Sequence, residues 1–282
     1  MRRLSMNQMT VRSLSIPELL AACRRHEVPA VGLWRDPVQA HGVTRTAREV
    51  EESGLQVSSL CRGGFLTNPA NQPEALADNR RAIDEAAELG AQSLVLVVGG
   101  LFDRDLRAAR TRVADAVAEL APYAAEREVV LALEPMHPVF CADRGVLSTL
   151  KQALDMVEAI GSPAVRVVVD TVHVWWDPEV EAQIARAGER IALYQVCDWI
   201  TPLPADVLAG RGIPGQGHID FGQLGRCVAG AGYAGVAEVE VFHEEVWAAD
   251  PEEVFARVVA AHRELVLPGL ESARTAQIGP LG

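Results

Sequence analysis

The sequence predicts a (β/α)8 TIM barrel, the α/β fold in which parallel strands alternate with helices. Short apolar runs alternate along the chain with longer segments of helical period, as in proteins built from repeated β-α units. Eight such runs can be counted, and the 282 residues suit a fold that commonly takes about 250. An open doubly wound sheet is the alternative that the same alternation allows.

The apolar runs are the candidate strands, because strands of a barrel are buried on both faces and contain few polar residues. In chain order they cover residues 3–8, 29–34, 55–61, 91–98, 129–134, 164–170, 191–198 and 235–242.

Amphipathic segments between these runs are the candidate helices, with apolar residues three or four positions apart. Pro17 and Pro73 suit a first helical turn, and Gly90 and Gly161 suit the end of a helix. The clearest segments cover residues 16–26, 73–90, 105–127 and 147–161.

We expect a single barrel domain over residues 1–268, since no linker rich in Pro, Ser or Gly divides the chain. From about residue 268 the sequence loses its periodicity. We therefore expect residues 269–282 to form a flexible C-terminal tail.

Charge and composition exclude several classes of partner. The formal net charge is −12, whereas nucleic acids and anionic membranes are bound through clustered Lys and Arg. The five cysteines form no CxxC pair, which is typical of reduced thiols in a cytoplasmic protein. No apolar stretch suits a signal peptide or a membrane span. We expect a cytoplasmic protein with a small-molecule partner, and the sequence also allows a homo-oligomer.

Acids and an amide stand near the ends of four predicted strands: Glu134, Asp170, Gln195 and Glu240. The C-terminal ends of barrel strands build the active site, so these side chains should converge. Glu238 shares a strand face with Glu240, but Glu240 lies nearer the strand end and is the preferred ligand.

Several carboxylates in one buried mouth repel one another unless a cation neutralises them. A divalent metal resolves this conflict. Oxygen ligands suit Mn²⁺ or Mg²⁺ best, and Co²⁺ or Zn²⁺ are the alternatives.

Two histidines follow the acids by three residues each. His173 follows Asp170 and His137 follows Glu134, and either imidazole can serve as an acid or base near neutral pH. The tryptophans near strand ends offer aromatic faces to the CH face of a sugar or cyclitol, although packing of loops on helices explains each equally well. The substrate-binding candidates among them are Trp34, Trp175 and Trp176.

The segment RGIPGQGHIDF (211–221) contains three glycines but matches no phosphate-binding loop. We interpret it as the loop after the seventh strand, in which Arg211 reaches back to the site. A solvated surface position for Arg211 is the alternative. Asp220 should begin the next helix.

Eight stretches of this chain together resemble the xylose isomerase-like TIM barrels known as sugar phosphate isomerases/epimerases. They are LSMNQMT (4–10), AVGLWRDPV (30–38), SSLCRGGF (58–65), LEPMHPVFCADR (133–144), VVVDTVHVWWDP (167–178), YQVCDW (194–199), RGIPGQGHIDF (211–221) and GYAGVAEVEVF (232–242).

The resemblance implies that Glu134, Asp170 and Glu240 bind the metal, that His173 is the family's D-x-x-H imidazole, and that Arg211 contacts substrate. Many epimerases of the family have a histidine ligand on the seventh strand, where this chain has Gln195. Its amide oxygen can still bind a hard cation, as in the branch similar to inosose dehydratase and to lyases of C-glycosides.

The implied reaction removes a proton next to the carbonyl of a keto sugar or keto cyclitol, giving an enediolate that the metal stabilises. Glu134 and Glu240 would remove and return the proton, which gives an isomerase or epimerase. If His173 or His137 protonates a leaving hydroxyl, the outcome is a dehydratase or lyase. A non-catalytic sugar-binding or partner subunit, and a barrel endonuclease, are the remaining alternatives.

Overall fold

The computed structural model describes residues 3 to 276, in which eight parallel strands close into one barrel. Closure excludes the open doubly wound sheet, so the predicted (β/α)8 fold is confirmed. Each strand lies within one of the predicted runs except β3, which continues beyond its run. The barrel strands are β1 (Leu4–Asn7), β2 (Ala30–Trp34), β3 (Gln56–Gly64), β4 (Leu94–Val97), β5 (Leu131–Leu133), β6 (Val165–Asp170), β7 (Ile191–Val196) and β10 (Ala237–Val239).

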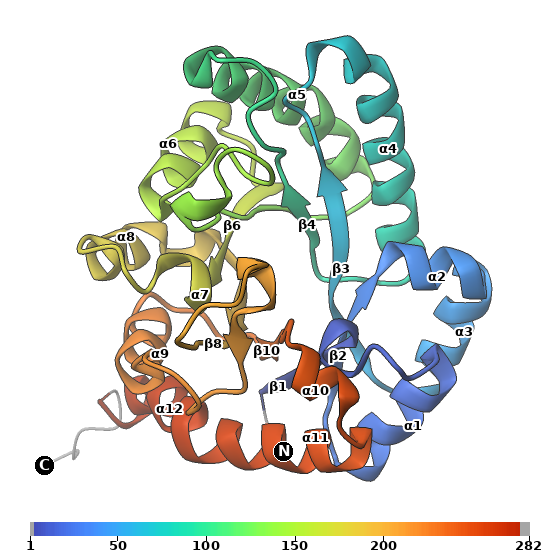
Figure 1. Ribbon diagram of the computed structural model, residues 1–282. Coiled ribbons are helices and arrows are strands. Elements are labelled where there is room, and N and C mark those ends of the chain that lie inside the picture. Colours follow the sequence, from blue (N-terminus) through green and yellow to red (C-terminus); the bar gives the residue numbers. More distant parts are fainter. Residues whose placement is uncertain (1–2, 277–282) are drawn as a thin grey trace, which may run out of the picture.

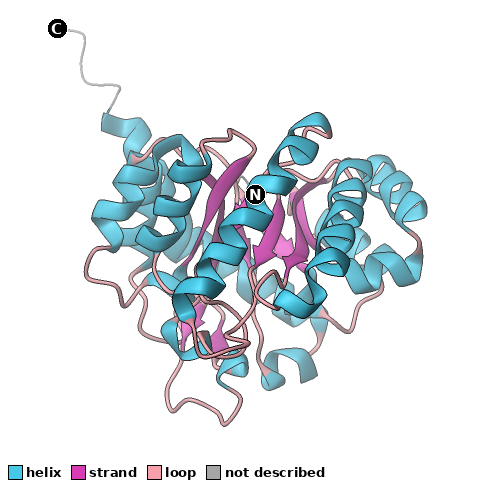
Figure 2. Ribbon diagram, turned by 90° about the horizontal axis from the view of Figure 1, so that it is seen from above, coloured by secondary structure: helices cyan, strands magenta, loops and turns pink. Residues whose placement is uncertain are grey.

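Helices surround the strands on the outside of the barrel (Figures 1 and 2). Pro17 lies in the first turn of its helix and Gly161 ends its helix in the left-handed conformation, as the sequence predicts. The helices are α1 (Ile16–Arg25), α2 (Arg35–His41), α3 (Val43–Ser53), α4 (Gln72–Glu88), α5 (Leu106–Glu126), α6 (Leu150–Ile160), α7 (Thr171–Val174), α8 (Val180–Ala187), α9 (Phe221–Gly230), α10 (Glu244–Ala248), α11 (Pro251–Ala261) and α12 (Leu267–Ala276).

A small antiparallel pair, β8 (Asp198–Trp199) and β9 (Arg211–Gly212), lies outside the barrel sheet. The sequence analysis assigns residues up to 198 to the seventh barrel strand, but β7 ends at Val196. In the β8–β9 pair Trp199 is opposite Arg211, so the pairing returns Arg211 to the end of β7.

The expected tail from residue 269 is wrong for its first part. Residues up to 276 continue in α12, which packs beside α9 (Figure 1), and Leu270 is only 1% exposed. Gly225 of α9 and Gly269 of α12 meet closely, since a Cβ on Gly225 would lie 3.2 Å from Cα of Gly269. Residues 277–282 of the predicted tail lie outside the described residues.

The strands alternate between two apolar environments. Most buried side chains form one large core between sheet and helices, whereas Ala132, Val168 and Leu193 belong to a separate cluster in the barrel interior. Residues two apart on a strand share a face. Glu134, Asp170 and Gln195 therefore continue the interior face beyond this cluster, toward the C-terminal mouth.

Among residues 3–276, no helix is long and apolar enough to cross a membrane.

Candidate active site

Four strands deliver the candidate ligands to one end of the barrel. Asp170 ends β6 and pairs in register with Gln195 of β7, which in turn pairs with Glu238 of β10. Glu134 follows β5 directly, and the backbone N–H of Glu240 donates to Val196 of β7. All of these positions lie at the C-terminal ends of their strands, which meet at one mouth of the barrel.

Glu134, Asp170 and His173 form the tightest group of these residues. One ligand atom from each lies within 4.8 Å of the others, and all three residues are buried. Asp170 divides its carboxylate between two roles: Oδ1 accepts a hydrogen bond from the backbone of Val172 at the start of α7, and Oδ2 faces the site. The structure therefore places His173, predicted as an acid or base, among groups that could bind a metal.

Arg211 joins the remaining acid to this group. Its Nη1 lies 2.9 Å from Oε2 of Glu240 and 3.4 Å from Oδ2 of Asp170. The Arg211 side chain is 4% exposed, so the alternative of a solvated surface charge is wrong. One guanidinium faces three carboxylates, which leaves an excess of negative charge that a divalent cation would balance.

Burial raises the pKa of these acids. The pKa of Glu134 lies well above its ordinary value because the carboxyl is buried and Asp170 and Glu240 lie nearby. Burial also raises the pKa of Glu240, to about 7, against the opposing effect of Arg211. Burial raises the pKa of Asp170 too, and Arg211 again opposes it. Carboxyls with a raised pKa hold a proton more readily than exposed carboxyls do.

His173 is held as a neutral imidazole. Burial, with the positive charge of Arg211, lowers its pKa well below the ordinary value. Its Nδ1 lies 3.1 Å from the backbone nitrogen of His137, which donates to it. The neutral ring then carries its proton on Nε2, which lies 3.8 Å from Oε1 of Glu134 and 3.1 Å from Nη2 of Arg211.

Two buried oxygens at this mouth have no hydrogen-bond partner among residues 3–276: Oε1 of Gln195 and Oε1 of Glu240. A buried polar atom without a partner costs free energy, so such atoms commonly face a ligand, ion or water. Together with the carboxylates of Glu134 and Asp170 they form an oxygen-rich ligand set. The residues present thus fit a hard divalent cation.

The second glutamate of β10 has a different environment. Glu238 is fully buried, and the donors around it are Asn7, Ser58, Ser59 and Gln195. These come from β1, β3 and β7, so the Glu238 side chain points into the barrel like Glu240. The structure thus agrees with the expectation that both share a face, and it places Glu238 against Gln195.

The tryptophans divide between the mouth and the core. Trp34 packs edge-on against Phe242 at 5.7 Å between ring centroids, and its Nε1 donates to Asn7. Trp176 donates from Nε1 to the carbonyl oxygen of His173. Trp175 packs against the main core, so for this residue the packing alternative describes its contacts better.

His137 lies with its ring among aromatic side chains. It stacks on Trp199 with 4.7 Å between ring centroids and meets Trp176 edge-on at 5.5 Å. Burial lowers its pKa. It contacts His173 through its backbone N–H, and so it positions the predicted acid or base of the D-x-x-H segment.

Phe242 belongs to the site but is absent from the sequence prediction. The guanidinium carbon of Arg211 lies 4.8 Å from the centroid of its ring, a cation–π arrangement. A signal existed: Phe242 follows Glu240 by two positions, and alternation in an extended segment places both side chains on one face.

Asp198 anchors the segment that carries Arg211. Its carboxylate accepts hydrogen bonds from the backbone N–H groups of Trp199, Gly215, Gly217 and Ile219 at 2.8 to 3.0 Å. The glycine-containing loop is thus held by an acid. Asp220 accepts from the backbone of Gln223 at the start of α9, as expected.

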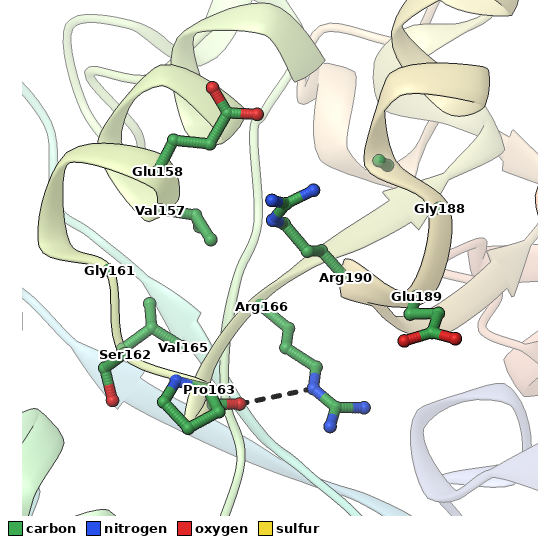
Figure 3. Close-up of a pocket in the computed structure, with 11 residues that line it drawn as sticks. Val157, Glu158, Gly161, Ser162, Pro163, Val165, Arg166, Gly188, Glu189 and Arg190 are labelled. Atoms are coloured by element: carbon green, nitrogen blue, oxygen red, sulfur yellow. Dashed lines mark hydrogen bonds between the residues drawn. The ribbon is translucent and has the colours of Figure 1, made fainter.

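A hollow of about 530 Å³ lies at the opposite end of the barrel, before the first residues of β6 and β7 (Figure 3). Arg166, Glu189 and Arg190 surround it, and Arg166 donates to the carbonyl oxygen of Pro163. These charged side chains are not buried, in contrast to the acids at the C-terminal mouth. We assign the candidate active site to the mouth.

Comparison of the whole chain with known protein families gives a match. The family described as "Xylose isomerase-like TIM barrel" matches residues 20–265. The chain belongs to this family. The resemblance stated from the eight sequence stretches is thereby confirmed.

Two proteins of known structure superpose on nearly the whole chain. Protein SMc04130 from Sinorhizobium meliloti 1021 is 42% identical, covers 94% of this chain and 98% of its own, and has a TM-score of 0.91. The IolI protein, solved with a zinc atom, is 20% identical, with 96% and 99% covered and a TM-score of 0.81. The likeness to IolI shows the fold alone.

A D-psicose 3-epimerase from Enterocloster bolteae is a sequence relative. It is 26% identical over 187 residues, which cover 61% of this chain. The match spans 57% of that protein's length.

Proposed function

We propose that this protein is a divalent-metal-dependent isomerase or epimerase of a keto sugar or keto cyclitol. The observation that carries the proposal is the buried group of Glu134, Asp170, His173, Arg211 and Glu240 at the C-terminal mouth. Membership of the xylose isomerase-like family, and the name of the D-psicose 3-epimerase relative, support this class of reaction.

Glu134, Asp170, Gln195 and Glu240 would hold the metal. All four offer oxygen, which favours Mn²⁺ or Mg²⁺, with Co²⁺ or Zn²⁺ as alternatives; the zinc atom of the IolI structure supports a divalent ion in this family. When bound, the metal supplies Lewis-acid stabilisation of the negative charge that develops on substrate oxygen.

Glu134 and Glu240 would transfer the proton. They come from β5 and β10, which are separated in the barrel by β6 and β7, so a substrate between them could lose a proton to one and regain it from the other. Burial raises the pKa of both, that of Glu240 to about 7, which suits a general acid–base pair.

His173 and Arg211 would bind a substrate oxygen. Nε2 of His173 and Nη2 of Arg211 are 3.1 Å apart, and with Nδ1 of His173 accepting from the backbone both nitrogens carry hydrogen. Two N–H donors so close repel each other unless both point toward one shared acceptor. A carbonyl or hydroxyl oxygen of a sugar is such an acceptor, and Trp34 and Trp176 could cover its CH face.

The test is exchange of solvent deuterium into keto sugars and inososes by the metal-loaded protein. We expect Glu134→Gln and Glu240→Gln each to reduce exchange by at least 100-fold, because each removes one acid–base group. Glu119→Gln, an exposed glutamate on α5, is the matched control and should exchange at the wild-type rate. Full exchange in both site variants would contradict the acid–base assignment.

A dehydratase or lyase is the second candidate, favoured by the neutral, buried His173 beside the acids. A neutral imidazole with its proton on Nε2 could protonate a leaving hydroxyl. Loss of water from an inosose, abolished in His173→Ala, would establish this outcome. Exchange without loss of water would support the epimerase. Absence of both, in a protein that still binds sugar, would support a non-catalytic binding subunit.

A further inference from the structure

Glu238 is a buried acid in the barrel interior that the proposed reaction does not use. It is 0% exposed, and its Oε1 accepts hydrogen bonds from Asn7 Nδ2 at 2.8 Å and Gln195 Nε2 at 3.0 Å. Its Oε2 accepts from the hydroxyls of Ser58 and Ser59 at 2.5 and 2.8 Å. Donors from β1, β3 and β7 thus surround the carboxylate inside the barrel.

The backbone of β2 leaves space for the Glu238 side chain at Gly32. A Cβ on Gly32 of β2 would lie 2.5 Å from Cδ of Glu238, so only glycine fits there without moving the carboxylate. Gly32 has no positive φ that would demand glycine. The absence of a side chain at Gly32 therefore leaves the space that the Glu238 carboxylate occupies.

The Glu238 carboxylate decides which way the Gln195 amide points. An ionised carboxylate only accepts hydrogen bonds, so it attracts the amide nitrogen and repels the amide oxygen. The nitrogen therefore faces Glu238, and Oε1 is left on the other side of the amide, buried and without a partner. In the sheet register Gln195 lies between Glu238 and Asp170.

We infer that Glu238 is a positioning residue. It fixes the Gln195 amide with its oxygen toward the metal-binding acids, so that Gln195 offers the metal an oxygen ligand. The inference rests on the proposed metal-dependent function. Without Glu238 the amide is free to turn its nitrogen, a donor that cannot bind a cation, toward the metal. Partners of this kind commonly change metal affinity by 10- to 100-fold when mutated.

The experiment measures Mn²⁺ affinity by isothermal titration calorimetry on the full-length, metal-free chain. We expect Glu238→Ala to weaken binding by about 10- to 100-fold. Glu238→Gln should bind within about threefold of wild type, because its carbonyl oxygen can still accept from Asn7 and Gln195. Ser58→Ala is the matched control: it removes a buried donor to Oε2, the oxygen that Gln195 does not contact.

A double-mutant cycle separates positioning from simple charge. In a Gln195→Ala background, Glu238→Ala should cause no further loss of Mn²⁺ affinity, because the amide it would position is gone. An equal loss in both backgrounds, or a loss in Glu238→Gln as large as in Glu238→Ala, would show that Glu238 acts through its charge and would overturn the inference. Unchanged affinity in Glu238→Ala would overturn it as well.

The thermal melt of each metal-free variant shows whether that variant is folded. If Glu238→Ala lacks a cooperative melt, Glu238→Asp takes its place: it keeps the charge, draws the carboxylate away from Gln195, and should also weaken Mn²⁺ binding about tenfold or more. Wild-type affinity in Glu238→Asp would then count against positioning. If the wild type itself binds no divalent ion, the proposed function fails before any variant is compared.

Discussion

At the scale of single residues, the site is a cluster of buried charges that the chain neutralises incompletely. Glu134 and Glu240 are each 4% exposed and Asp170 is fully buried, and of these three acids Arg211 forms ion pairs with Glu240 and Asp170. When no metal is bound, such a cluster can lose negative charge by taking up protons. The stability of the metal-free protein should therefore depend on pH.

We predict that metal-free protein becomes less stable as pH rises from about 4.5 to 7. Burial raises the pKa of Glu240 from 4.5 to about 7, against the attraction of Arg211 and with the repulsion of Asp170 and Glu238. In this window the folded protein holds a proton that the unfolded chain releases, so the free energy of unfolding falls by about 3 kcal/mol. Glu134 acts in the same direction.

Urea unfolding in the presence of a chelator, at pH 5, 6, 7 and 8, measures this dependence. Glu240→Gln cannot titrate at this position, so it should lose the part of the dependence that Glu240 contributes and show a shallower fall than the wild type. An equally steep fall in the wild type and in Glu240→Gln would mean that other groups are responsible.

How much of the site the sequence predicts depends on the kind of information each residue carries. Glu134, Asp170 and Glu240 are acids at strand ends, so alternation and barrel geometry locate them, and Arg211 follows from the motif around it. The pairing of Glu238 with Gln195 depends on the register between β7 and β10, which no local pattern contains. The packing of Trp175 in the core likewise depends on tertiary contacts.

At the scale of elements, the loop between β9 and α9 depends on a single carboxylate. Asp198 is 1% exposed and accepts hydrogen bonds from four backbone N–H groups, most of them in that loop. In the sequence analysis Asp198 appears only as the last residue of the predicted strand 191–198. Its anchoring role could not be seen because the loop donors lie up to 21 residues away.

Asp198→Asn should destabilise the protein by about 2–4 kcal/mol. The amide nitrogen cannot accept, so some buried N–H groups of the loop lose their partner. Urea unfolding measures the change. Asp220→Asn is the matched control on the same loop, because asparagine caps a helix as well as aspartate does. Equal effects of the two changes would contradict the anchoring role of Asp198.

The last helix is the element that the sequence analysis assigned to a flexible tail. Helix α12 contains few apolar residues, so its periodicity is weak, yet the close approach of Gly269 to α9 and the burial of Leu270 dock it. Leu270→Ala should cost about 2–5 kcal/mol of folding free energy, measured by urea unfolding. Leu265→Ala, at a side chain 40% exposed, should cost less than about 1 kcal/mol. A Leu270→Ala variant as stable as wild type would show that α12 is dispensable.

At the scale of the whole molecule, barrel closure brings residues from distant parts of the sequence into one site. β1 pairs with β10, so residues from the first and last strands meet, as Asn7 and Glu238 do. The alternation of strands and helices predicts the barrel and the end at which the acids lie. It does not predict the substrate, because the loops around the mouth determine which molecule fits.

The central claim is that the buried acids bind a divalent metal, and metal titration of the purified full-length protein tests it most directly. We predict about one Mn²⁺ or Mg²⁺ per chain, a higher melting temperature with the ion than without it, and loss of both in Asp170→Ala. Wild-type protein that binds no divalent ion, or Asp170→Ala protein that binds it as tightly as the wild type, would contradict the account.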